Sequence, residues 1–298
     1  MKKLRFKKID AFASEHSCGN PAAVVCLDRL EELSEDEKMR IAKELKGFVS
    51  EVGYVCPGTE TDYELCYYSS EREVAFCGHA TIAIMNDIVA SHEALHSQTT
   101  LSIATRTDRL QVENRYRDEK SVYISAPLPR FSMKEVGAAD IAAALTSRLE
   151  DLDPSRPIQM INGGLETLIV PMTGLASILR VTPDLQMLNE FCLRTGADIV
   201  LLYSSEVSFP ESRYRTRVFA PPYGYLEDPA TGSGNSAFGY YLLAHGMWNG
   251  NNMIIEQNGF RDAPNFVRIF SPKNGASNSR VWFGGGAVVR IDGYYHLE

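Results

Sequence analysis

Two stretches of the chain repeat the same order of residues, and this repeat constrains the fold more than any other feature. The first reads YELCYYSSEREVAFCGHATIAIM and the second reads YRTRVFAPPYGYLEDPATGSGNSAFGYYL. With a small insertion in the second copy, E-x3-C-G-H at residues 73–79 aligns with E-x3-T-G-S at residues 227–233. In each copy an extended segment leads through a turn and a glycine into an apolar stretch with helical spacing. The repeat predicts two pseudo-twofold domains that face each other across a cleft, although chance similarity of two strand–turn–helix units explains it equally well.

Strand-like segments outnumber helical ones in both halves, which predicts an α+β protein. A capping box from Ser34 to Glu37 predicts a helix start, and helices are also expected over VGAADIAAALTSRLE and DLQMLNEFCLRTG. The stretch APLPRF near residue 128 reads as a linker. A length of 298 residues fits two domains.

Composition and charge exclude several classes of protein. Hydrophobic residues make up 44% and charged residues 23% of the chain, as in ordinary globular proteins. The formal net charge of −8 argues against nucleic-acid and anionic-membrane partners, which require a basic surface. No signal peptide or membrane span is recognisable, and the six scattered cysteines read as reduced thiols. We therefore expect a cytoplasmic protein.

Two short motifs suggest cofactors but lack the context that those cofactors need. His92 to His96 spells H-E-x-x-H, yet its segment is short, polar and followed by Ser and Thr, so we interpret it as a solvated helix end. Gly232, Gly234 and Ala237 fit G-x-G-x-x-A with Glu256 downstream, but a proline-bearing stretch separates them from the preceding strand. Neither turn ends as a Walker A loop does. We predict neither a metal nor an organic cofactor.

The two glycine-bearing turns can bind anions if they open helices. A helix N-terminus presents N–H groups and the positive end of the helix dipole, and glycine allows a ligand to approach the backbone at Gly78, Gly232 and Gly234. A glycine before a helix is more often a plain cap than a ligand site. A small anionic substrate is nevertheless compatible with two such helix starts.

Three residues, two of them in these turns, are candidates for moving a proton. His79 occupies the position that Ser233 has in the second copy, and Asp228 precedes Pro229. Glu51 lies among three valines, and an apolar setting suits a general acid/base. From the residues alone, Glu51 fits a solvent-facing strand position better, while His79 and Asp228 also fit a helix cap and a turn.

These residues lie within motifs that resemble the phenazine-biosynthesis PhzF-like family, whose fold is that of diaminopimelate epimerase. The matches are ordered along nearly the whole chain: DAF…GNPAAVV at residues 10–25, Ser50-Glu51, EVAFCGHAT at 73–81, EDPATGSG at 227–234, and a final GGGAVV…DG segment. The combination of CGHAT and DPATGSG, in this order and separation, is highly specific.

The resemblance implies two domains, each a curved, mostly antiparallel sheet around a central helix, with the active site in the cleft between them. It implies an N-terminal domain over residues 1–127, completed by a last strand at about 286–298, and a C-terminal domain over 128–285. Such proteins are usually homodimers.

The resemblance also implies roles for individual residues in a cofactor-independent isomerase of a small carboxylate-bearing substrate. Glu51 would shuttle the proton as general acid/base, and His79, Asp228 and Ser233 would orient the substrate and assist the glutamate. Substrate binding would fall to Asn20, Gly78, Gly232 and Gly234. The sequence departs from the family at SEVGY, where SETAF is common, and at YSS, where FTP is usual. Because these residues are expected to shape the binding site, the physiological substrate stays open.

Two other functions compete with this one. A two-base epimerase or racemase of an amino acid would use two cysteines, but Cys77 aligns with Thr231, so we interpret Cys77 as a small buried residue. A metabolite-binding protein without turnover would keep the site but lose its chemistry. The complete set of Glu51, His79, Asp228 and Ser233 argues against that loss.

Overall fold

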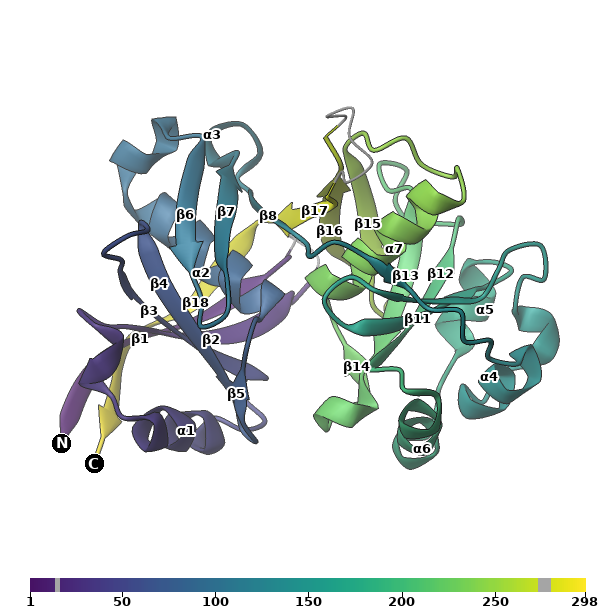
Figure 1. Ribbon diagram of the computed structural model, residues 1–298, viewed down its shortest axis with the longest axis horizontal. Coiled ribbons are helices and arrows are strands. Elements are labelled where there is room, and N and C mark those ends of the chain that lie inside the picture. Colours follow the sequence, from purple (N-terminus) through teal and green to yellow (C-terminus); the bar gives the residue numbers. More distant parts are fainter. Residues whose placement is uncertain (14–16, 273–279) are drawn as a thin grey trace. The chain divides into compact units, whose positions relative to one another are not determined.

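The computed structural model describes residues 1–13, 17–272 and 280–298 (Figure 1). These residues form two compact units. Unit 1 comprises Met1–Ser125 together with Gly284–Glu298, and unit 2 comprises Ala126–Phe283. Both combine helices with strands that pair mostly antiparallel, which confirms the predicted mixture of α and β structure.

The elements of unit 1 are β1 (Lys2–Ala11), β2 (Asn20–Cys26), η1 (Leu30–Glu32), α1 (Glu35–Glu44), β3 (Glu51–Pro57), β4 (Tyr63–Ser69), β5 (Glu73–Val74), α2 (Gly78–Ser91), η2 (Glu93–Ser97), β6 (Thr100–Ala104), β7 (Arg109–Asn114), α3 (Tyr116–Glu119), β8 (Val122–Ser125) and β18 (Ala287–Leu297). Strand β17 (Trp282–Gly285) spans the boundary between the units.

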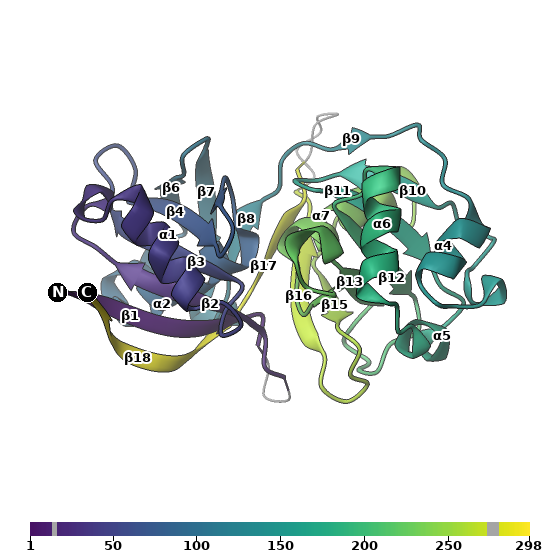
Figure 2. The ribbon, with the colours of Figure 1, turned by 90° about the horizontal axis from the view of Figure 1, so that it is seen from below.

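The sheet of unit 1 bends around helix α2. Its strands pair in the order β18, β1, β2, β3, β4, β6, β7, β8, and only β2–β3 and β4–β6 are parallel. Helix α2 contacts β1, β2 and β3 and also reaches β18 and β8 at the two ends of this order. Figure 2 shows β1 and β18 running side by side, from Lys2 opposite Leu297 to Ala11 opposite Ala287.

Helix α1 covers the outer face of the same sheet. Ser34 caps it through a hydrogen bond from Glu37 N to Oγ, and Glu37 accepts one from Ser34 N, so the predicted capping box is confirmed. Ile41 and Ala42 are buried in a core with apolar residues of β1, β3 and β4. This second layer buries the other face of β3, so the strand is covered on both sides.

Unit 2 is built from β9 (Arg130–Phe131), α4 (Ala138–Ala144), η3 (Leu149–Asp151), β10 (Gln159–Asn162), β11 (Glu166–Pro171), α5 (Leu175–Arg180), α6 (Leu185–Thr195), β12 (Ile199–Ser204), β13 (Tyr214–Phe219), η4 (Pro221–Tyr223), β14 (Glu227–Asp228), α7 (Gly232–Ala244), β15 (Met253–Gln257) and β16 (Asn265–Phe270).

The sheet of unit 2 encloses α7 in the same manner. The strand order is β9, β10, β11, β12, β13, β15, β16, with β11–β12 and β13–β15 parallel. Helix α7 contacts β10, β11, β12 and β16, while α4, α5 and α6 share an apolar core with strands of the sheet. The predicted helices over α4 and α6 are confirmed, and Asp184 and Gly196 cap the two ends of α6.

The strand pairing repeats between the units, which confirms the internal repeat at the level of register. In unit 1, β4 pairs antiparallel with β5 and parallel with β6; in unit 2, β13 pairs antiparallel with β14 and parallel with β15. Glu73 lies opposite Tyr68, and its aligned counterpart Glu227 lies opposite Phe219. Chance similarity of two turns does not produce this agreement.

Two predictions about local structure are wrong in part. The stretch interpreted as a linker near residue 128 contains β9, which pairs with β10 through Phe131 and Ile161. The segment VWFGGGAVVRI, interpreted as one strand, forms two strands that are separated by Gly286.

Within the described residues, no helix has both the length and the apolar character that crossing a membrane demands.

Gly232 packs so tightly that alanine cannot replace it without rearrangement. A Cβ atom at residue 232 would lie 2.1 Å from the ring of Phe283 in the same unit. Gly232→Ala should therefore lower the free energy of unfolding by about 1–3 kcal/mol, the usual cost of overpacking a core. Urea denaturation measures it. The control is Gly293→Ala, because a Cβ at residue 293 has nothing within 4 Å. Equal stability of the two variants would contradict this assignment.

Candidate active site

Glu51 is buried at the start of β3, between two neighbouring strands. It pairs in register with Ala22 of β2 and with Ser69 of β4, and its exposed fraction is 7%. The solvent-facing position that the residues alone favoured is therefore wrong. Strand residues two apart share a face, so Glu51 lies on the same face as Gly53.

The packing at Gly53 shows that the face of β3 that carries Glu51 contacts helix α2. A Cβ atom at residue 53 would come within 2.6 Å of Ile84 Cδ1 on α2. The missing side chain lets the helix approach β3 closely. Glu51 consequently points toward α2, near the end at which the helix begins.

His79, in the first turn of α2, meets the Glu51 carboxylate. His79 Nε2 lies 3.3 Å from Glu51 Oε2, and both side chains are buried. Burial lowers the pKa of His79 from 6.5 to about 4. The imidazole is therefore neutral at pH 7, and its N–H can donate a hydrogen bond to the carboxylate.

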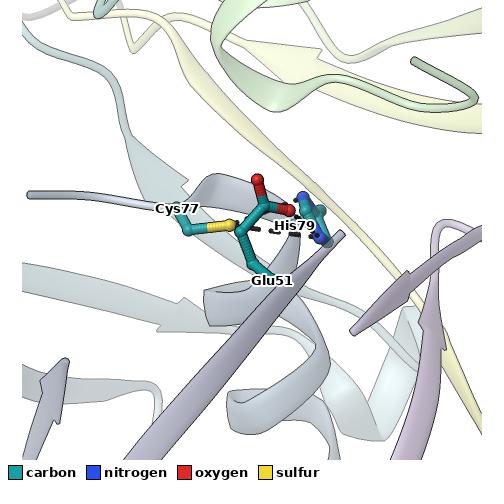
Figure 3. Close-up of side chains that lie close together, drawn as sticks. All are labelled: Glu51, Cys77 and His79. Atoms are coloured by element: carbon teal, nitrogen blue, oxygen red, sulfur yellow. Dashed lines mark hydrogen bonds and ion pairs between the residues drawn. The ribbon is translucent and has the colours of Figure 1, made fainter. Parts of the chain in front are cut away.

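Cys77 completes a group of three side chains, which Figure 3 shows converging from β3 and from the start of α2. It is the N-cap residue of α2, and its Sγ lies 3.5 Å from His79 Nδ1 and 4.0 Å from Nε2. The prediction that Cys77 is buried is confirmed. The contact of Cys77 with His79 was not predicted from the sequence. The motif C-G-H at a predicted helix start was the feature of the sequence that could have indicated it.

These three side chains are also the candidate metal ligands. Their ligating atoms all lie within 4.8 Å of one another, and no other group of this kind occurs in residues 1–13, 17–272 and 280–298. His92 and His96 instead contact the backbone oxygens of Ile88 and Val89, at the end of α2 and in η2. The interpretation of H-E-x-x-H as a helix end is confirmed.

The remaining candidate residues of unit 1 lie at the start of strand β2 and at the start of helix α2. Gly78 is the first residue of α2, so its amide belongs to the first turn, where N–H groups lack partners within the helix. Asn20 is the first residue of β2 and is buried. Gly19 before it has a positive φ of 69°, a conformation that favours glycine.

Asp228, Gly232, Ser233 and Gly234 lie in unit 2, around the turn between β14 and α7. Asp228 is buried and accepts a hydrogen bond from Ala230 N. Ser233 is half-buried in the first turn of α7. The structure thus places Glu51 and His79 in contact, and it places Asp228 and Ser233 in the other unit.

A buried glutamine, missed in the sequence, holds the turn of unit 2. Gln257 Nε2 donates to the Asp228 carbonyl and to Thr231 Oγ1, while Gln257 Oε1 accepts from Thr231 N and from Asn235 Nδ2. No local motif signals this role, because Gln257 is 26 residues beyond Thr231 along the chain. The neighbouring Glu256 forms a fully buried ion pair with Arg215, so its carboxylate is not available to a ribose.

Comparison with known proteins places this geometry in a family context. Residues 9–293 match the family described as PhzC-PhzF, phenazine biosynthesis-like protein. The chain is 31% identical over 259 residues to "Uncharacterized isomerase YfhB" of Bacillus subtilis, covering 86% of this chain and 87% of that one. It is 26% identical to "Trans-2,3-dihydro-3-hydroxyanthranilate isomerase" of Pseudomonas aeruginosa, covering 81% and 80%. A crystal structure of a Bacillus anthracis phenazine biosynthesis protein of the PhzF family matches with a TM-score of 0.86 at 23% identity, covering 100% of both chains.

The lowered pKa of His79 should make the folded protein sensitive to acid. In the unfolded chain an imidazole binds a proton as the pH falls through about 6.5, whereas buried His79 stays neutral down to about 4. Its contribution to stability is therefore complete above pH 6.5 and is lost as the pH falls toward 4. The loss amounts to about 3 kcal/mol at most.

The measurement is urea denaturation at pH 7 and at pH 4.5 of the wild type, His79→Gln and His92→Gln. Between these pH values the wild type and the exposed-site control His92→Gln should lose about 2–3 kcal/mol more than His79→Gln does. Parallel losses in all three proteins would show that His79 titrates normally.

Proposed function

The chain belongs to the PhzC-PhzF family of phenazine biosynthesis-like proteins, and we propose that it is a cofactor-independent isomerase that moves a proton on a small carboxylate-bearing substrate. The observation that carries the proposal is the buried Glu51 carboxylate, 3.3 Å from a neutral His79 ring. Curated relatives that cover most of the chain are named isomerases, which supports the reaction class.

We propose that the contacts of Cys77 with His79, and of His79 with Glu51, prepare Glu51 to act as the base. Cys77 Sγ is nearer to Nδ1 of His79 than to Nε2. We propose that the thiol donates to Nδ1, which leaves the proton of the neutral ring on Nε2. The Nε2–H group then faces Glu51 Oε2 at an N–O distance of 3.3 Å. In this arrangement Cys77 selects the tautomer and His79 orients the carboxylate, while neither carries the transferred proton.

The proposed reaction needs only Glu51 to exchange a proton with carbon. The carboxylate takes a proton from a substrate carbon, and the C–H electron pair moves into the adjoining unsaturated system. The protonated Glu51 then returns the proton to another carbon of that system, which shifts the double bond. Proton and electrons balance within the substrate and one carboxyl group.

The substrate class follows from the helix starts. The first turn of the 14-residue helix α2 presents amides of Gly78 and His79 beside Cys77, and such a turn favours a carboxylate. Ser233 occupies in α7 the position of His79 in α2. That Asp228 and Ser233 orient the substrate stays a prediction from the family resemblance. A homodimer stays a prediction from the family resemblance.

The two-base epimerase is the less favoured alternative. Cys77 and Thr231 are the N-cap residues of α2 and α7, so the register of the repeat pairs a thiol with a hydroxyl. Thr231 Oγ1 accepts a hydrogen bond from Gln257. A threonine hydroxyl is a far weaker acid than a thiol, so this pair cannot supply two matched proton donors.

Glu51→Gln should abolish most turnover while preserving the fold. General acid/base catalysis typically contributes about 10²–10⁴-fold, and an amide cannot accept the proton. Activity is followed by NMR as hydrogen exchange in D₂O, first with trans-2,3-dihydro-3-hydroxyanthranilate and then with a panel of cyclic and aromatic amino acids. The control is Glu71→Gln, which alters an exposed carboxylate. Near wild-type exchange in Glu51→Gln would reject the assignment.

The role of Cys77 separates the isomerase from the epimerase. Cys77→Ser keeps a donor for His79 Nδ1 and should retain substantial activity, whereas Cys77→Ala loses the donor and should be slower by about tenfold or more. In D₂O the product should carry a shifted double bond with part of the original hydrogen retained. An inverted α-carbon, together with an inactive but folded Cys77→Ser, would establish the epimerase instead.

A further inference from the structure

The cluster of Glu51, Cys77 and His79 has a second chemical capacity. We propose that these three side chains bind one Zn²⁺ ion, through Cys77 Sγ, His79 Nε2 and a carboxylate oxygen of Glu51. Metal binding is independent of the isomerase proposal, because it depends only on the positions and chemistry of the three ligand groups.

The spacing of the ligand atoms is close to that of a zinc site. With Zn–S of about 2.3 Å and Zn–N or Zn–O of about 2.0 Å, ligand atoms in a tetrahedral site lie about 3.3–3.5 Å apart. His79 Nε2 lies 3.3 Å from Glu51 Oε2 and 4.0 Å from Cys77 Sγ. All ligand atoms are within 4.8 Å of one another, so small side-chain rotations bring them around one ion.

The donor set selects zinc over the harder divalent ions. A thiolate, an imidazole and a carboxylate suit Zn²⁺, whereas Mg²⁺ and Ca²⁺ prefer oxygen ligands alone. His79 would bind the ion as the neutral imidazole, through the lone pair of Nε2. Cys77 must lose its proton to solvent when the Zn–S bond forms. Three protein ligands leave the fourth position of the tetrahedron for water.

Zinc in this position would inhibit the proposed enzyme. The ion would occupy the lone pairs of Glu51 that take the substrate proton, and it would remove the Cys77 proton that sets the His79 tautomer. This consequence alone depends on the proposed function. Activity would therefore be highest after chelation and would fall as Zn²⁺ is added.

The test uses the reduced full-length protein, stripped of metal by a chelator and handled without oxygen. It is titrated with Co²⁺, whose visible bands report tetrahedral geometry and whose near-ultraviolet charge-transfer band reports a thiolate ligand. Zn²⁺ is then added to displace Co²⁺. We expect one Co²⁺ per chain, both spectral features, and complete displacement by one equivalent of Zn²⁺. Calorimetry in several buffers should show about one proton released per Zn²⁺ at pH 7.

Matched variants assign the site. Cys77→Ser should lose the charge-transfer band and bind Zn²⁺ on the order of 100-fold more weakly, because a ligand matters at least as much as an outer-shell partner. Cys66→Ser should bind as the wild type does, since burial raises the pKa of Cys66 to about 12 and opposes its thiolate. Cys18→Ser controls for an exposed thiol.

Three results would overturn the proposal: a charge-transfer band that survives in Cys77→Ser, a band that disappears in Cys18→Ser, or no saturable Co²⁺ binding by the wild type. Should Cys77→Ser fail to fold, His79→Gln and Glu51→Gln must each show the same loss of affinity, and unchanged binding in either rejects the site. Zinc binding by a protein whose metal-free form shows no isomerase activity would reject the proposed function alone.

Discussion

The enclosure of helix α2 by the sheet of unit 1 is the constraint on which the candidate site depends. An enclosed helix must pair its polar side chains, because unpaired polar groups are costly to bury. Lys7 Nζ of β1 donates a hydrogen bond to each carboxylate oxygen of Asp87 on α2, both at 2.7 Å. Asn86 donates to the Gly285 carbonyl. Gly53 lets α2 lie close against β3, and the start of the helix meets Glu51.

The two units share a pattern of strand pairing, but they carry chemically different side chains at equivalent positions. The register that aligns Glu73 with Glu227 also aligns Glu51 of β3 with Ile199 of β12. In unit 2 a Cβ atom at Gly234 would lie 3.2 Å from Ile199 Cδ1, so apolar packing occupies the place of the carboxylate. The repeated framework thus supplies two helix starts, and the strand position that holds the Glu51 carboxylate in unit 1 holds an isoleucine in unit 2.

Local features of the fold could be predicted from the sequence, and long-range ones could not. The caps of α1 and α6 were predictable because Ser34, Asp184 and Gly196 act within a few residues of themselves. The burial of Glu51 was not, since it depends on the parallel pairing of β2 with β3 and on a helix 27 residues further along the chain. The hydrogen bonds of Gln257 to the turn of unit 2 could not be predicted for the same reason. The resemblance to a family proposed Glu51 and His79 together, whereas the contact of Cys77 with the ring depends on side-chain orientation at a helix start.

The pairing of β1 with β18 has a consequence for how the protein is made. Unit 2 is one continuous stretch of chain, and unit 1 contains strands that come before it and strands that come after it in the sequence. A ribosome therefore synthesises all of unit 2 before it synthesises β18. During that interval β1 has β2 on one edge and nothing from its own chain on the other, so an exposed strand edge persists while the rest of the protein can already fold. The time needed to translate the intervening unit 2, rather than the stability of the finished fold, sets how long that edge is open to wrong partners.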